Sequence, residues 1–297
     1  MLACAVLLAF QGMAAGAQPV SRADSVTVTS QKSREIINAF VTSLTAPARL
    51  TGKLGRWDVG ICPTVIGVRP EAVRFVIQRV RDTAARIGAP VNADASCRPN
   101  IHIVFTTTPQ ALLTNIRNNH SQLLGYADSA ANKARLATVT LPIQAWYFTQ
   151  TRDNRGKTLF DVPNGVVGEG REIIGLPLPH AQGAVAVTSG RLGDSTRTVF
   201  YNLLIVADPN ALLDHEMGTV ADHVAMLALA QTEPLKDCPT LPSILNLFTP
   251  GCATRPIGMT PADEGYLRGL YSMDARAFLQ TQRDQMVRKI GQTIEGR

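Results

Sequence analysis

The stretch GTVADHVAMLALAQ, residues 218–231, decides how the rest of the sequence is interpreted. Nearly all of its residues are apolar, which is typical of a helix that is buried on every side. Thr219 is followed three residues later by Asp222, and this spacing predicts a capping pair at the start of the helix. We therefore expect a buried helix over residues 219–231. Its single histidine, His223, raises the question of a metal site.

The segments before this helix alternate between helical and strand patterns. In the second helical segment, Pro70 stands at the first turn and Gly88 closes the end, which is how a helix is bounded. Periodicity predicts helices over residues 33–46, 70–88 and 109–125, and strands over residues 56–68, 99–109 and 136–151. Residues 152–182 are punctuated by glycine and proline and are expected to form a loop.

The order of the elements fixes the fold class. Residues 183–190 and 196–208 are expected to form a hairpin that turns at residues 190–195. After the buried helix, we expect a proline-rich segment, a short helix over residues 261–270 and a long helix from Met273 to about Ile294. Helices and strands in this order predict an α+β fold with a mixed sheet.

The first residues carry the marks of export. Residues 1–17 contain no charge, are apolar through MLACAVLLAF and end in Ala15, Gly16 and Ala17. This pattern predicts a signal peptide over residues 1–17, followed by a polar linker over residues 18–31. The apolar stretch is too short to span a bilayer, so we expect no stable membrane span after its removal. The predicted location is periplasmic or extracellular.

The cysteines agree with this location. Removal of residues 1–17 takes away Cys4 and leaves an even number, namely Cys62, Cys97, Cys238 and Cys252. In an exported chain this predicts two disulfides, for which four cysteines allow three connectivities. The pairing of near neighbours, Cys62 with Cys97 and Cys238 with Cys252, is the preferred one. No C-x-x-C spacing occurs that would favour a metal site.

The distribution of charge along the sequence argues against a nucleic-acid partner. The formal net charge is +6, but the basic residues are spread along the sequence without a lysine or arginine run. Nucleic-acid binding domains concentrate such residues on one face or in one stripe. We therefore expect a solvated basic surface and no nucleic-acid binding.

Three segments near the C-terminus resemble the metzincin-type zincin metallopeptidases. They are GTVADHVAMLALAQTE (218–233), PSILNLF (242–248) and MTPADEGYLRGLY (259–271). In that family an H-E-x-x-H helix supplies two histidines one turn apart and a glutamate that acts as base on the metal-bound water. A tight S-I-M-N turn lies below the metal, and a helix with an L-T-x-x-D pattern follows.

Carried onto this sequence, the resemblance implies a degenerate site. His223 falls on the first metal ligand, Val224 on the catalytic glutamate, Leu227 on the second ligand and Glu233 on the third. The family glycine falls on Ala230. The turn keeps its serine, isoleucine and asparagine while leucine replaces the methionine, at Ser243, Ile244, Leu245 and Asn246, and the following helix keeps Asp263, Leu267, Leu270 and Tyr271.

The resemblance also implies an architecture. We expect a zincin-like N-terminal subdomain over residues 32–232, with a mixed twisted sheet and ending in the former active-site helix. A mostly helical C-terminal subdomain over residues 233–297 would contain the turn at residues 243–248 and the terminal helix.

Two other arrangements of ligands are open to this sequence. His215 and Glu216 give the first half of an H-E-x-x-H motif, but Thr219 stands at the fifth position. His215 and His223 are eight residues apart, about 12 Å along a continuous helix, which is too far to share one ion. A site made of His223, Glu233 and a distant residue such as His180 has no spacing in its favour. Asp222 cannot replace the missing glutamate, because it would point to the opposite side of the helix.

These observations predict an exported, zincin-like protein that has lost the peptidase machinery and acts by binding a protein or peptide. No cofactor is expected, and no catalytic residue is assigned. The alternatives are an active zinc metallopeptidase with an unorthodox site around His223 or His215, and a structural protein of the cell envelope.

Overall fold

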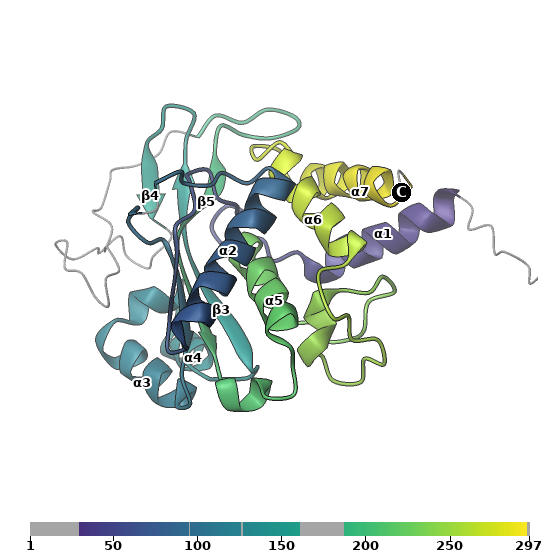
Figure 1. Ribbon diagram of the computed structural model, residues 1–297. Coiled ribbons are helices and arrows are strands. Elements are labelled where there is room, and N and C mark those ends of the chain that lie inside the picture. Colours follow the sequence, from purple (N-terminus) through teal and green to yellow (C-terminus); the bar gives the residue numbers. More distant parts are fainter. Residues whose placement is uncertain (1–29, 95, 126, 161–186, 296–297) are drawn as a thin grey trace, which may run out of the picture.

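The computed structural model describes residues 30–94, 96–125, 127–160 and 187–295 (Figure 1). The predicted signal peptide, most of the linker, His180 and residues 183–186 of the predicted hairpin lie outside these ranges. The elements follow in the order α1 (Ser30–Leu44), β1 (Pro63–Ile66), α2 (Pro70–Ile87), β2 (Ile101–Phe105), α3 (Pro109–Asn119), η1 (Ser121–Leu124), α4 (Ala130–Leu136), β3 (Ile143–Arg152), β4 (Thr158–Phe160), β5 (Arg197–Ala207), η3 (Pro209–Leu212), α5 (Met217–Leu229), η4 (Ile244–Phe248), α6 (Pro261–Ser272) and α7 (Leu279–Glu295). The predicted α+β class is confirmed.

The strands of the described residues form one mixed sheet in the order β1-β2-β5-β3-β4. β1, β2 and β5 are parallel, whereas β3 runs antiparallel to β5 and β4 antiparallel to β3. β4 pairs only with residues 150–152 of β3. The long strand β3 therefore has β5 as its ladder partner on one side, and over residues 143–147 no described strand pairs with its other side.

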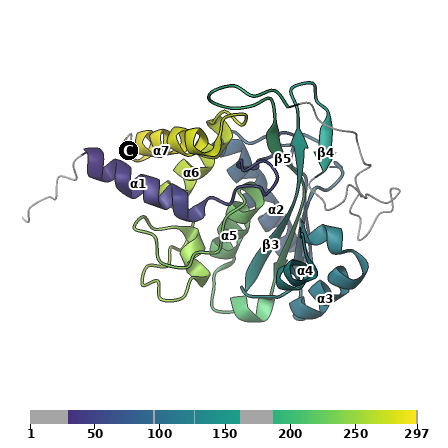
Figure 2. The same ribbon diagram turned by 180° about the vertical axis from the view of Figure 1, so that it is seen from behind.

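The two faces of the sheet are covered by different helices. Along β5, Leu203, Ile205 and Ala207 contribute to the main hydrophobic core, while Leu204 and Val206 belong to a second, smaller one. This alternation follows from the two-residue period of a strand. The main core contains α2 and α5, and the smaller core contains α3, η1 and α4, so the helices form layers on both faces (Figures 1 and 2).

The C-terminal part adds a further helical layer. α1, α6 and α7 gather on the side of α5 that faces away from the sheet (Figures 1 and 2). Phe40 of α1 and Tyr266 of α6 meet edge to face, with ring centroids 6.4 Å apart. Residues of both predicted subdomains thus share one hydrophobic core, from Ile37 to Ile290.

The caps explain which helix boundaries were predicted correctly. α2 has Pro70 in its first turn and ends at Gly88, whose φ of 82° is left-handed. Glycine adopts that conformation without a steric penalty, and both boundaries were predicted. Thr260 and Asp263 form a reciprocal capping box at the start of α6, which also begins where the sequence predicts.

The predicted start of the terminal helix at Met273 is wrong. α6 ends at Ser272 and α7 begins at Leu279. Between them the guanidinium of Arg56 donates hydrogen bonds to the carbonyls of Leu270 (2.8 Å) and Met273 (3.0 Å). These bonds satisfy the end of α6 and hold the chain in a turn before α7, a tertiary contact that the local pattern does not contain.

The loop predicted over residues 152–182 contains a strand at its start. β4 follows a tight turn in which the Asp153 carboxylate accepts hydrogen bonds from the amides of Arg155 and Lys157. Gly156 supplies a left-handed residue with φ of 81°. Aspartate and glycine at these positions are typical of a hairpin turn. The loop prediction is therefore wrong for residues 158–160, which form a strand. Of the predicted second hairpin, the described part shows an isolated bridge between Ser189 and Asp194.

The buried helix α5 is the centre of the fold. It begins at Met217, two residues before the predicted start, and every residue from Thr219 to Leu229 is buried. Its last carbonyl groups have no partner within the helix and need donors from elsewhere. Three aromatic side chains supply them: Tyr147 to Leu227 (2.7 Å) and Ala230 (2.8 Å), Trp57 to Ala228 (2.8 Å), and Tyr271 to Leu229 (2.9 Å).

A buried lysine joins distant parts of the chain. The ammonium of Lys53, whose side chain is 1% exposed, donates to the Asp194 carboxylate (2.5 Å) and to the carbonyls of Thr196 (2.7 Å) and Arg276 (2.9 Å). Burial raises the pKa of Asp194, but the hydrogen bonds from Lys53 and Thr196 outweigh this and leave it lowered. All three donors of the ammonium are used, as a buried charge requires.

The two disulfides have the preferred connectivity. Cys62 is bonded to Cys97 and Cys238 to Cys252, with Cα atoms 6.1 and 5.4 Å apart. The first ties the start of β1 to the segment before β2, and the second closes the irregular loop around η4. Among the helices that the structure describes, none has both the length and the apolar character needed to cross a membrane.

The aromatic donors at the end of α5 lead to a stability prediction. Tyr271→Phe removes only the hydroxyl that binds the Leu229 carbonyl, which leaves a buried acceptor without a partner. We expect a loss of about 1–3 kcal/mol in the free energy of unfolding, measured by urea denaturation. The matched control is Tyr266→Phe, because no hydrogen bond from that hydroxyl to a described residue is present. Equal losses in the two variants would contradict a role for the Tyr271 hydroxyl.

Candidate functional site

His223 lies at the middle of α5 with its ring inside the protein. The side chain is buried, and its Nδ1 lies 3.2 Å from the carbonyl oxygen of Ile244 in η4. Since a carbonyl only accepts, Nδ1 carries the proton and donates this bond. The ring also meets that of Phe248 edge to face, with centroids 4.9 Å apart. His223 therefore anchors the turn at residues 243–248 beneath the helix.

Burial determines the protonation state of this histidine. Desolvation lowers the pKa of His223 to about 4; the bond to Ile244 raises it slightly, and the nearby His215 lowers it. The imidazole is consequently neutral at neutral pH. A second buried histidine, His102 on β2, has its pKa lowered to about 4 for the same main reason.

The other polar residues of α5, Thr219 and Asp222, have structural partners. Asp222 binds the guanidinium of Arg79 (2.8 Å) and accepts a hydrogen bond from the amide of Met259 (3.1 Å). The Thr219 hydroxyl donates to the carbonyl of Ile257 (2.7 Å) instead of capping the helix. The predicted capping pair is therefore wrong, and both side chains hold the loop before α6 against the first turns of α5.

The turn and the following helix are joined through one carboxylate. Asp263 accepts hydrogen bonds from the Ser243 hydroxyl (2.6 Å) and from the amides of Ile244 (2.8 Å) and Thr260 (2.9 Å). Burial raises the pKa of Asp263, and these hydrogen bonds act against that rise. The three segments that were singled out in the sequence, which contain His223, Ser243 and Asp263, are thus in direct contact.

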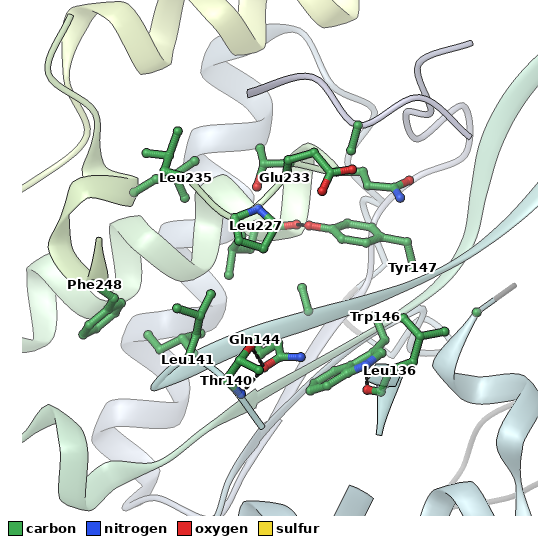
Figure 3. A pocket seen from close by; sticks show the side chains of 18 of the residues that line it. Leu136, Thr140, Leu141, Gln144, Trp146, Tyr147, Leu227, Glu233, Leu235 and Phe248 are labelled. Carbon is green, nitrogen blue, oxygen red and sulfur yellow. Dashed lines mark hydrogen bonds between the residues drawn. The ribbon is translucent and has the colours of Figure 1, made fainter. Parts of the chain in front are cut away.

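A pocket of about 400 Å³ opens beside these segments. One wall is strand β3, from which Gln144, Trp146 and Tyr147 come, and the facing wall is the chain after α5, with Glu233 and Leu235 (Figure 3). His223, Leu227, Leu245 and Phe248 also line it. The lining combines apolar side chains with polar and charged ones, so the pocket offers both apolar contact and hydrogen-bonding groups to a ligand.

Of the four positions that the resemblance assigns to the metal ligands and the base, three line this pocket and one does not. Leu227 and Glu233 line the pocket together with His223, whereas Val224 does not and is fully buried in the main core. The backbone of Glu233 is fixed by a hydrogen bond from its amide to the Leu44 carbonyl (3.2 Å). Three of the four positions therefore meet at one pocket.

His215 comes closer to His223 than a continuous helix would allow, because α5 starts only at Met217. The ring of Phe248 meets both imidazoles edge to face, with its centroid 5.4 Å from that of His215 and 4.9 Å from that of His223. Phe248 was not singled out from the sequence, and an aromatic residue after the turn gives no local sign of this role.

The residues at this pocket do not fit a zinc ion. Of the metal-ligand positions after His223, the second holds the aliphatic Leu227 and the third holds Glu233, which stands beyond the end of α5. Zinc sites in enzymes take three nitrogen, oxygen or sulfur ligands. Within the described ranges, no cluster of three or more histidine, cysteine or acidic side chains has the geometry to hold a metal.

The free side of β3 has main-chain groups that point toward the pocket edge. The amide of Leu203 donates to Asn100 on the β2 side (3.0 Å), so Leu203 and its partner Tyr147 form a non-hydrogen-bonded pair. In an antiparallel ladder the N–H and C=O of Tyr147, and those of Ala145 two residues earlier, then face away from β5. Gly125 approaches the Tyr147 carbonyl closely, since a Cβ there would lie 2.7 Å from it. This leaves the half-buried Ala145 as the residue beside the pocket whose main-chain N–H and C=O face away from β5.

No protein-family model, curated protein or solved structure matches this chain.

The neutral state of His223 gives a prediction for stability against pH. Its pKa in the folded protein lies below the ordinary value of 6.5, so its contribution is fully present above pH 6.5 and is lost as the pH falls toward 4. One such histidine lowers the free energy of unfolding by about 1.4 kcal/mol per pH unit in that window. We expect His223→Gln to reduce the slope of the free energy of unfolding against pH between pH 6.5 and 4 by the equivalent of about one proton. Denaturation at a series of pH values measures this slope.

The comparison for this variant is His102→Gln, which should reduce the slope by a similar amount because the same burial lowers the pKa of His102. The double variant, with both His223→Gln and His102→Gln, should show the smallest change of the free energy of unfolding with pH. If the slope of the free energy of unfolding against pH is unchanged in His223→Gln, the ring of His223 is not held neutral by burial in the folded protein.

Proposed function

We propose that this chain is an exported, zincin-like protein without peptidase activity that binds an extended protein segment at the pocket beside β3. The observation that carries the proposal is the combination of an outward-facing strand residue, Ala145, with an adjoining pocket of about 400 Å³ that offers apolar and polar side chains. An extended chain can add to such a strand through main-chain hydrogen bonds while one side chain enters the pocket.

Contacts among the three family-like segments support the zincin-like part of this proposal. His223 donates to the turn at Ile244, and Asp263 binds both the turn and the start of α6. The order helix, turn, helix is that of the family, and Leu245 at the methionine position lines the pocket near Leu227.

The side chains at the former catalytic positions support the loss of peptidase activity. The family chemistry needs a glutamate base and a second histidine, and Val224 and Leu227 have neither an acidic nor a metal-binding group. Phe248 also packs edge to face against both histidines of this region. In our proposal, His223 is a structural residue that orders the turn.

Export is supported by the two disulfides, because such bonds persist in oxidising compartments. The partner in this proposal is a protein or peptide of the periplasm or the extracellular space.

The strand variant tests the binding mode. Ala145→Pro removes the outward N–H without touching the ladder to β5, a position at which an edge strand tolerates proline. We expect it to weaken binding of an extended peptide at least tenfold, measured by fluorescence anisotropy with a labelled peptide that binds the unaltered protein, because a main-chain hydrogen bond is lost.

Ala145→Val is the matched control, since it adds a similar bulk at the pocket but keeps the N–H. It should bind the peptide at least several times more tightly than Ala145→Pro. If both variants bind equally, the main chain of β3 does not take part; thermal unfolding of each variant verifies that the fold is kept.

The metal content tests the absence of a zinc site. We expect the purified, oxidised protein to retain far less than one equivalent of zinc after dialysis, measured by inductively coupled plasma mass spectrometry, because the ligand positions after His223 do not supply a set. One equivalent of zinc that disappears in His223→Ala would overturn the proposal and favour an active metallopeptidase.

A further inference from the structure

The segment that leads from β5 into α5 carries unpaired acidic residues. In residues 213–217, with the sequence LDHEM, the side chains of Leu213 and Met217 are 81% and 39% exposed, and Asp214 and Glu216 are also exposed. Neither carboxylate makes a hydrogen bond or ion pair with any residue that the structure describes. This segment thus presents two apolar and two negatively charged side chains to the solvent.

This acidic segment adjoins one end of the pocket. The His215 ring contacts Phe248, which lines the pocket. The amide of Asp208 donates to the carbonyl of Pro142 (2.9 Å), which stands between two lining residues, Leu141 and Ile143. The acidic segment therefore lies at the end of the pocket where β3 begins.

The basic residues of the pocket lining do not neutralise this segment by any ion pair among the described residues. Arg49 and Arg135 line the pocket, and Arg49 pairs with Asp128. Asp214 and Glu216 therefore remain as two exposed acidic side chains, without an ion pair to a described residue, near the start of β3.

We propose that the bound segment carries basic residues on the C-terminal side of the apolar residue that enters the pocket. This inference rests on the proposed function. An antiparallel strand forms the more stable ladder, and a chain added antiparallel to β3 runs toward residue 143. Its residues after the anchor then reach Asp214 and Glu216, where lysine or arginine side chains find unpaired carboxylates while its apolar side chains contact Leu213.

The test compares short fluorescein-labelled peptides that contain one leucine in a background of alanine, serine and threonine. One set has two lysines after the leucine, a second has them before it, a third has two glutamates after it, and a fourth is neutral. We expect the first set to bind about tenfold more tightly than the second and fourth in anisotropy titrations at low salt. In about 1 M salt, where the Debye length is about 3 Å, the advantage should disappear.

Two variants locate the charge effect. The double variant Asp214→Asn, Glu216→Gln should remove the advantage of the first set and leave the neutral peptides unchanged. The control Glu71→Gln, at an exposed position on α2, should keep the advantage. Equal binding of all sets overturns the inference, and tighter binding of the second set overturns the direction.

The outcomes separate this inference from the proposed function. Binding of neutral peptides that Ala145→Pro abolishes, without any preference for lysine, overturns the inference and leaves the proposed function intact. No binding by any set overturns both.

Discussion

The burial of α5 constrains the rest of the structure. An apolar helix can occupy the centre of the protein only if the carbonyls at its C-terminal end find donors, because an unpaired buried carbonyl costs about 1–3 kcal/mol. The donors come from Trp57 before β1, Tyr147 on β3 and Tyr271 on α6. Through these three bonds the helix fixes the positions of the N-terminal segment, the antiparallel strand and the C-terminal layer, and the pocket lies where the first two meet the end of the helix.

The pocket inherits its shape from this arrangement. The single hydroxyl proton of Tyr147 is shared between the carbonyls of Leu227 and Ala230 at the end of α5, and the same ring lines the pocket, so the strand cannot move away from the helix without breaking this interaction. The facing wall is fixed by the bond between Glu233 and Leu44 and by the turn that His223 holds. A site framed by such bonds is largely formed before a ligand arrives, which reduces the entropy lost on binding.

Local sequence signals predicted the elements whose ends depend on nearby residues. α2 has its proline and glycine at the two ends, and α6 begins at its capping box. The start of α7 was not predictable because Arg56, more than two hundred positions earlier, holds the chain between α6 and α7. The candidate histidine was found from its helix, but Phe248, Tyr147 and Ala145 entered the site only through tertiary contacts, which leave no periodic pattern in the sequence.

The Lys53 ammonium has a consequence for the time at which the protein can finish folding. Its acceptor on Arg276 lies 223 positions further along the chain. At a synthesis rate of about 5–20 residues per second, that carbonyl leaves the ribosome roughly 11–45 s after Lys53 does. During this interval the lysine has no third acceptor, so burying it is unfavourable, and the segment around it stays solvated until nearly the whole chain has been made. The segment around Lys53 therefore reaches its native environment only near the end of synthesis.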